Sequence, residues 1–180
     1  MIEQKPMETA TASPAPAPDP AAREMALERL RAEQSLPAGL MAGLAASLVG
    51  AAVWAVLTAV TEFQIGWMAV GVGFLVGFSV RLAGRGLDQV FGVAGSVLSL
   101  LGCVAGNLLA VVVMLSKQEA LPFIEIMSRL DVSAAAQLLT ATFNPIDLVF
   151  YGIALYEGYR LSFRQVTEAD IAQALAGARG

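Results

Sequence analysis

The chain has 180 residues, of which 57% are hydrophobic and 14% charged, and its formal net charge is −4. Soluble globular domains are about 45–50% apolar and about 25% charged, so this composition excludes a soluble enzyme domain, a secreted disulfide scaffold and a disordered polymer. The lack of histidine and the single cysteine, Cys103, exclude His-based catalysis, His metal ligands and an intrachain disulfide. We therefore predict that the protein is not an enzyme, with no catalytic residue, metal or cofactor. No basic stripe is interleaved with aromatic residues, which argues against nucleic acid as a partner.

The N-terminal region separates into two segments. Residues 1–22 hold five of the eight prolines, and the alternation of proline with alanine predicts an extended, disordered arm. Residues 23–35 are rich in helix-forming side chains and predict a juxtamembrane amphipathic helix that ends near Pro37. Arg29 and Glu33 are four residues apart in this helix, and we expect them to form an ion pair.

The rest of the chain is dominated by long uncharged stretches. No charged residue occurs from Gln34 to Thr61 or from Gln89 to Ser116. Runs of about 18 or more apolar residues are typical of membrane spans rather than core helices. The sequence therefore predicts an all-α integral membrane bundle of four transmembrane helices. The domain is expected to cover residues 36–164, with spans at 36–60, 65–82, 90–115 and 145–163.

The distribution of basic residues predicts the orientation of these spans. With the N-terminus inside, nine of the eleven Lys and Arg residues lie on the inner side and only Lys117 and Arg129 lie outside. Cytoplasmic flanks carry the excess of Lys and Arg in membrane proteins. Both termini are therefore predicted to be cytoplasmic.

The connection between spans three and four, residues 117–143, is too long for a tight turn. Its residues Phe123, Ile126, Met127 and Leu130 share one face of a helix. We expect an outer amphipathic segment that lies on the membrane surface, caps the bundle or re-enters the membrane.

The C-terminal tail, residues 165–180, is predicted to contain a helix. Thr167 followed three residues later by Asp170 resembles a capping box. The apolar face of the tail helix, which includes Ile171, is expected to bind either a soluble partner or the juxtamembrane helix near Leu30.

Small residues recur at four-residue spacing in the first three spans. In lipid, helix association depends on close packing, and small residues let two backbones approach each other. These stripes predict either packing within the chain or an interface between copies of it. The residues concerned are Gly39, Gly43, Gly73, Gly77, Gly95, Ser99, Gly102 and Gly106.

Four polar residues within or beside the spans form a candidate polar site. Asn107 either hydrogen-bonds a neighbouring helix or lines a polar pathway. Asp147 is expected to cap the start of the fourth span. Glu157 and Arg160 either pair and extend toward the interface or face the bundle interior as an ion or substrate site.

Part of the chain resembles a known group of proteins. Four stretches carry this resemblance: 62–81 (EFQIGWMAVGVGFLVGFSVR), 101–103 (LGC), 106–107 (GN) and 156–160 (YEGYR). They resemble segments of an uncharacterised family of small bacterial four-span membrane proteins. The resemblance covers residues 39–164. It implies a bacterial inner membrane, but the family has no established activity, so no catalytic residue carries over.

Two functions are compatible with these features. The first is a non-enzymatic scaffold or accessory subunit of a membrane complex, which fits the packing stripes and the two cytoplasmic extensions. Its partners would be the lipid bilayer and either another protein or a second copy of the chain, bound through small-residue faces. The second is a transporter or channel subunit whose polar site forms on oligomerisation.

Overall fold

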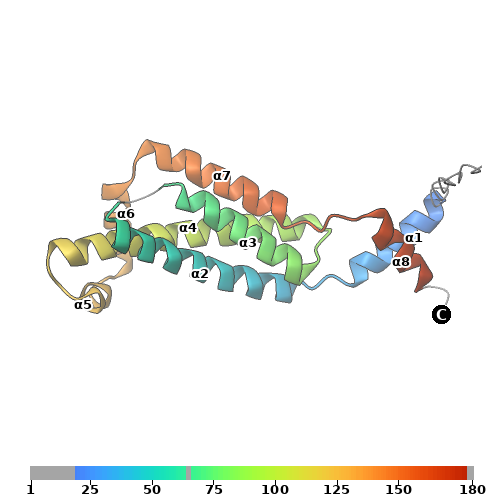
Figure 1. Ribbon diagram of the computed structural model, residues 1–180, viewed down its shortest axis with the longest axis horizontal. Coiled ribbons are helices and arrows are strands. Elements are labelled where there is room, and N and C mark those ends of the chain that lie inside the picture. Colours follow the sequence, from blue (N-terminus) through green and yellow to red (C-terminus); the bar gives the residue numbers. More distant parts are fainter. Residues whose placement is uncertain (1–18, 64–65, 178–180) are drawn as a thin grey trace, which may run out of the picture.

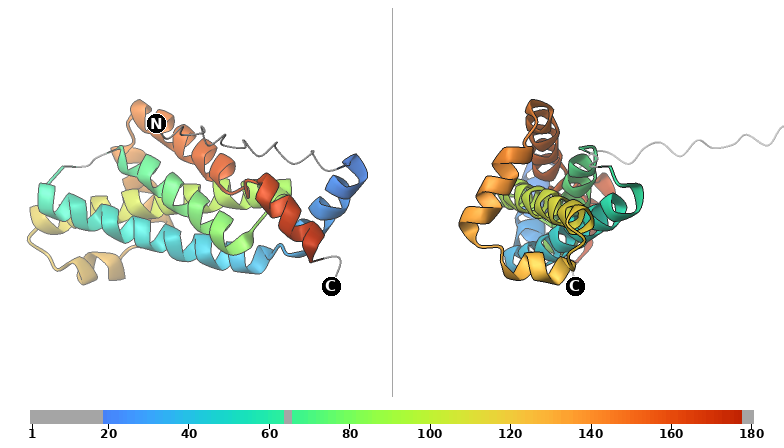
Figure 2. Two further views of the ribbon diagram at one scale, coloured as in Figure 1. Left: turned by 45° about the vertical axis from the view of Figure 1, so that its right-hand side comes forward. Right: turned by 90° about the vertical axis from the view of Figure 1, so that its left-hand side faces the viewer.

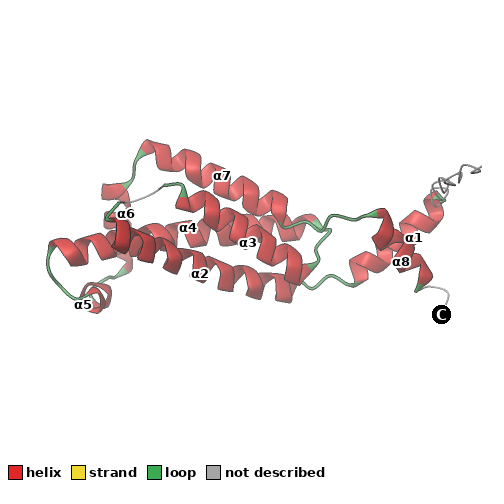
Figure 3. Cartoon of the chain, in the orientation of Figure 1, coloured by secondary structure: helices red, strands yellow, loops and turns green. Residues whose placement is uncertain are grey.

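The computed structural model describes residues 19–63 and 66–177, and within these ranges every regular element is a helix (Figure 3). The all-α class is therefore confirmed. Residues 1–18, which make up most of the predicted arm, lie outside the described residues, as do residues 64–65 at the start of the second predicted span and residues 178–180. The helices are α1 Pro20–Ala32, α2 Leu36–Thr61, α3 Met68–Gly84, α4 Gln89–Gln118, α5 Phe123–Ser128, α6 Val132–Thr142, α7 Pro145–Leu161 and α8 Glu168–Ala176.

Four helices, α2, α3, α4 and α7, run side by side as an elongated bundle (Figure 1). Within this group α3 and α4 each contact the other three helices, whereas α2 and α7 contact only α3 and α4. The central position of these two helices follows from their small residues, which let several neighbours approach.

The helices differ in their ability to cross a membrane. At a rise of about 1.5 Å per residue, α2 is about 39 Å long and α4 about 45 Å, whereas α3 and α7 are each about 25 Å. Of the described helices, α2 and α4 are long and apolar enough to cross a membrane, and α6 with α7, which meet at 109°, would be a third if the pair is one broken span. The described residues thus hold two to three candidate spans, which indicates a membrane protein.

The starts of α2 and α1 show two ways of dealing with the first backbone N–H groups of a helix. The Ser35 hydroxyl accepts a hydrogen bond from the Ala38 backbone N–H at the start of α2. At the start of α1 the first residue is Pro20, which needs no acceptor for a backbone N–H. The helix therefore begins inside the range 1–22 that was predicted as a disordered arm.

The two ends of the bundle carry different elements. The helices α1 and α8 pack together at one end, and α5 and α6 lie at the other, next to α4 (Figures 1 and 2). Ala26, Leu30 and Ile171 are buried between α1 and α8. Of the two predicted positions for the tail helix, the structure shows the one against the juxtamembrane helix.

The expected ion pair between Arg29 and Glu33 is absent. The Arg29 guanidinium instead donates to the Ala174 backbone carbonyl on α8 at 3.3 Å, and the Glu33 carboxylate lies 3.2 Å from Arg164. The prediction was wrong because it considered only the helix that contains both residues. In the structure, α8 supplies another acceptor for Arg29, and the segment after α7 supplies another cation for Glu33.

The predicted outer segment forms the two short helices α5 and α6. Ile126 is buried against the end of α4, as expected for the apolar face of α5, while Phe123 and Ile124 are exposed. No residue of α6 is buried. Two short helices joined by a short turn are thus present at this end of the molecule, and only α5 buries an apolar side chain.

The eight small residues predicted for helix packing all lie at contacts inside the chain. A Cβ atom at Gly102 would lie 3.2 Å from the Ser47 Cα on α2, and one at Gly95 would meet the backbone of Gly158 on α7. Ser99 is fully buried beside Gly158. The remaining contacts join Gly39 to Gly84, Gly43 to Val80 and Leu98, Gly73 to Ala154, Gly77 to Leu161, and Gly106 to Trp54.

The turn between α3 and α4 contains Gly84 and Gly86 at its two sides. Left-handed backbone falls on Arg85, with φ of 50°, and on no glycine of the described chain. Gly84 and Gly86 instead leave room for the Phe91 ring, because a Cβ at Gly86 would lie 2.0 Å from its Cγ. Close approach, rather than φ freedom, explains these two glycines.

Candidate functional site

A polar cavity of about 240 Å³ lies at the α5–α6 end of the bundle. It is lined by residues of α2, α4 and α7 and of the segments that precede α3 and α7, among them Trp54, Asn107, Asp147 and Tyr151. A water molecule in liquid fills about 30 Å³, so the cavity has room for several waters or for one small polar molecule.

Asn107 is the central polar group of this cavity. The residue is 3% exposed, and the Tyr151 side chain on α7 lies beside it in the lining of the cavity. Asn107 thus faces a neighbouring helix and lines a polar cavity at the same time.

Trp54 supplies a second buried polar group. The residue is 2% exposed, and within residues 19–63 and 66–177 its Nε1–H has no hydrogen-bond acceptor. A buried donor without an acceptor costs about 1–3 kcal/mol. An acceptor within the cavity, either water or a ligand, would remove this cost.

Asp147 lines the cavity, and its side chain also caps a helix. Its Oδ2 accepts a hydrogen bond from the Asn144 backbone N–H at 2.9 Å, and the Asn144 Oδ1 accepts one from the Ile146 N–H at 3.2 Å. This capping box begins α7 and confirms the predicted cap. One carboxylate oxygen, Oδ1, remains for other contacts.

The structure does not bring the other two predicted polar residues to this cavity. Glu157 is ten residues beyond Asp147 on α7, or about 15 Å along the helix axis. Glu157 and Arg160 are both in the described chain, and no ion pair joins them. The candidate polar site therefore reduces to Asn107 and Asp147, joined by Trp54 and Tyr151.

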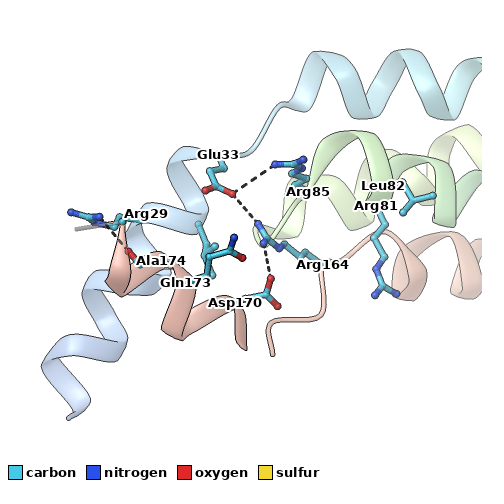
Figure 4. A pocket seen from close by; sticks show the side chains of 11 residues that line it. Arg29, Glu33, Arg81, Leu82, Arg85, Arg164, Asp170, Gln173 and Ala174 are labelled. Atoms are coloured by element: carbon cyan, nitrogen blue, oxygen red, sulfur yellow. Dashed lines mark hydrogen bonds and ion pairs between the residues drawn. The ribbon is translucent and has the colours of Figure 1, made fainter. Parts of the chain in front are cut away.

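A second, larger cavity lies at the opposite end, where α1 and α8 meet the bundle (Figure 4). Its volume is about 850 Å³. Four guanidinium groups and two carboxylates line it, from α1, from the end of α3, from the segment after α7 and from α8. These residues are Arg29, Arg81, Arg85, Arg164, Glu33 and Asp170.

Arg164 contacts α1, α8 and the turn between α3 and α4 at this cavity. Its guanidinium lies 3.2 Å from the Glu33 carboxylate on α1 and 2.9 Å from the Asp170 carboxylate on α8 (Figure 4). Its backbone N–H donates to the Gly86 carbonyl at 2.7 Å. Partial burial opposes the positive charge, but the hydrogen bonds and charges of Asp170 and Glu33 outweigh it and raise the pKa of Arg164.

The Asp170 carboxylate is held in its ionised form. It accepts hydrogen bonds from the Thr167 hydroxyl at 2.6 Å, from the Thr167 backbone N–H at 2.9 Å and from Arg164. These contacts, led by the Thr167 hydroxyl, lower the pKa of Asp170 from 3.8 to about 2. The capping box predicted for the tail helix is confirmed.

Sequence reasoning missed several residues of both cavities. Tyr151 is four residues beyond Asp147, so helical spacing alone would have placed the two on one face of α7. For Trp54, no local pattern distinguishes an indole that lines a cavity from one that fills the core. The arginines of the larger cavity were used only to predict the orientation of the spans. Their clustering was not predicted, because they come from segments far apart in the sequence.

Comparison with known proteins found no matching family model, no matching curated protein and no matching solved structure.

Proposed function

We propose that the chain crosses a bacterial inner membrane four times, through α2, α3, α4 and α7, with both termini in the cytoplasm. The outward faces of all four helices support this proposal, because they carry exposed large apolar side chains such as Leu48 on α2, Phe78 on α3, Val97 on α4 and Leu148 on α7. Contiguous apolar surface on this scale is unfavourable in water. The basic residues Arg81, Arg85 and Arg164 gather at the α1–α8 end, which is the inner end by the positive-inside rule.

Reporter fusions test this topology. A fluorescent protein that folds only in the cytoplasm should fluoresce when fused to the C-terminus and should stay dark when inserted after Leu130, between α5 and α6. The reverse result, or fluorescence at both positions, would contradict the four-span arrangement.

We further propose that the protein is a non-enzymatic scaffold or accessory subunit that presents the α1–α8 pair to a protein partner. The supporting observation is that α1 and α8, which are far apart in the sequence, form one helical unit that is bound to the bundle by specific contacts. Arg23 lies 3.4 Å from Glu168 across the pair, and Arg164 binds both helices. The Gln34 Oε1 also accepts hydrogen bonds from the Leu87 and Asp88 N–H groups. A docking unit ordered before binding loses less conformational entropy when a partner binds.

Site-specific photo-crosslinking in native membranes tests the scaffold. A crosslinking amino acid in place of Ala172, which is exposed on α8, should yield one dominant adduct with another protein. The same amino acid in place of Ala136, an equally exposed alanine on α6, is the matched control and should yield none. Equal labelling at both positions, or no adduct at either, would refute the proposal.

The polar cavity favours a second candidate, a transporter or channel subunit. Asn107 and Asp147 would then contact the transported species. Val72, Val76 and Val80 on α3 are almost completely buried in the apolar core of the bundle, so passage through the bundle would need an oligomer or a rearrangement. Solute or ion flux in proteoliposomes that falls on Asn107→Leu would support this candidate over the scaffold.

A further inference from the structure

The cavity beneath α1 and α8 holds more positive charge than its own carboxylates neutralise. Both acids of the cavity bind the same cation, Arg164, at 3.2 and 2.9 Å. Arg85 lies 3.9 Å from the same Glu33 Oε2 that Arg164 contacts, and the contact of Arg29 is with a neutral backbone carbonyl. Among the described residues, Arg81 has no ion pair at all.

The position of Arg81 makes this excess charge significant. The residue is half-buried at the end of α3, where a cation is partly removed from water, and removal from water is unfavourable without a counter-charge. Arg85 follows four residues later at the C-cap of the same helix. A single guanidinium group binds phosphate oxygens in a pair of parallel hydrogen bonds, so Arg81 and Arg85 are each able to act as a phosphate ligand.

An exposed apolar stripe leads along α3 into the same cavity. Phe74, Phe78 and Leu82 follow one another at four-residue spacing and are 41%, 43% and 75% exposed. The rings of Phe74 and Phe78 stack with their centroids 6.4 Å apart. Leu82 belongs both to this stripe and to the lining of the cavity (Figure 4). A molecule with an anionic head and apolar tails matches both surfaces at once.

We propose that this cavity binds the phosphate group of an anionic glycerophospholipid, with Arg81 and Arg85 as the phosphate ligands and the acyl chains along Phe74, Phe78 and Leu82. Basic pockets at the cytoplasmic side of membrane helices bind such headgroups. The volume of about 850 Å³ lies within the range of about 300–1,000 Å³ that is usual for small-molecule sites. An uncompensated positive charge selects a headgroup with net negative charge over a zwitterionic one.

Lipid titration of the full-length protein in detergent tests the site, with bound lipid counted by native mass spectrometry. Phosphatidylglycerol and phosphatidylcholine with identical acyl chains are compared, and inorganic phosphate is the third arm. Wild-type protein should bind phosphatidylglycerol about tenfold more tightly than phosphatidylcholine, and the double variant Arg81→Gln/Arg85→Gln should lose about tenfold in affinity for phosphatidylglycerol alone.

Arg160→Gln is the matched control, because Arg160 is an exposed arginine on α7 that is not part of the cavity lining. It should keep the full preference for phosphatidylglycerol. If the double variant does not fold, Arg81→Gln alone should show a smaller loss, and Arg81→Lys should restore part of it.

Three results would overturn the proposal. They are equal affinity of the wild type for both lipids, unchanged affinity in the double variant, and an equal loss in Arg160→Gln, which would reflect diffuse surface charge. If inorganic phosphate binds at the same arginines and phosphatidylglycerol does not, the lipid is overturned as the source of the phosphate group.

Discussion

Gly73 on α3 and Ala154 on α7 bring two helix backbones into direct contact. A Cβ atom at Gly73 would lie 2.7 Å from both the Cα and the carbonyl oxygen of Ala154. Contacts this close are made by backbone atoms, which cannot move aside as the end of a flexible side chain can. The contact therefore fixes the distance between α3 and α7.

Gly73→Ala should separate α3 from α7 and destabilise the bundle by about 1–3 kcal/mol, the usual cost of overpacking a tight core. Gly71→Ala is the matched control on the same helix, because a Cβ at Gly71 has no atom within 4 Å. The control should be neutral or more stable by up to about 1 kcal/mol, since alanine favours helix over glycine. Thermal unfolding in one detergent measures both, and equal effects of the two substitutions would contradict the contact.

Gly86→Ala should be as damaging, for a reason that involves a side chain. Its Cβ would lie 2.0 Å from the Phe91 Cγ, and Phe91 is 2% exposed in the core. The ring would have to leave its pocket, at a cost of about 1–3 kcal/mol. Gly152→Ala, where nothing lies within 4 Å, is the comparison. A double variant Gly86→Ala/Phe91→Leu that regains stability would identify the clash as the cause.

These glycines show what sequence patterns can and cannot predict. The long uncharged stretches predicted α2 and α4 within a few residues, because lipid demands length and apolarity from a helix regardless of its neighbours. The partner of each small residue is set by tertiary packing, and no local pattern contains that information. The same limit explains why Arg29 and Glu33 were paired with each other, although each has its partner in the C-terminal part of the chain.

The candidate polar site was predicted in part for the same reason. Asn107 and Asp147 were found because polar residues are rare in apolar helices and therefore conspicuous. Trp54 and Tyr151 were not predicted as part of the site because aromatic residues are common in such helices. Glu157 is equally conspicuous in the sequence but lies too far along α7 to reach the cavity.

A polar contact between Asn107 and Tyr151, which line the same cavity, should contribute measurably to stability. Asn107→Leu and Tyr151→Phe should each destabilise the protein, and the double variant should cost less than the sum of the two. The expected coupling energy is about 0.6 kcal/mol, with about 1.7 kcal/mol as the upper value for interhelical hydrogen bonds in membranes. Chemical unfolding in mixed micelles gives the four stabilities of the cycle, and strictly additive effects would show that the contact contributes nothing.

Trp54→Phe separates the two possible states of the polar cavity. If the cavity contains no acceptor for the Trp54 Nε1–H, the substitution removes an unsatisfied donor, worth about 1–3 kcal/mol, and this gain offsets the packing lost with the smaller ring, so stability should change by less than about 1 kcal/mol. A larger loss would show that the indole donates to bound water or to a ligand, which would favour the transporter candidate.

The attachment of α8 to α1 should depend on pH through Asp170. Because the folded-state pKa of Asp170, about 2, is lower than its ordinary value of 3.8, the ionised carboxylate stabilises the folded arrangement. This contribution is fully present above pH 3.8 and is lost as the pH falls through about 2. Acid should therefore release α8 before it unfolds the apolar bundle. The distance between spin labels at Glu24→Cys and Ala172→Cys measures the release, and the native Cys103 does not interfere because it is fully buried.

In Asp170→Asn, the labels should be separated in part of the population already at neutral pH, and the acid-induced change should be correspondingly small. Asp131→Asn, which removes the N-cap carboxylate of α6 at the other end of the molecule, should behave as the wild type. An identical pH profile in wild type and Asp170→Asn would show that the ion pair with Arg164 does not hold α8 in place.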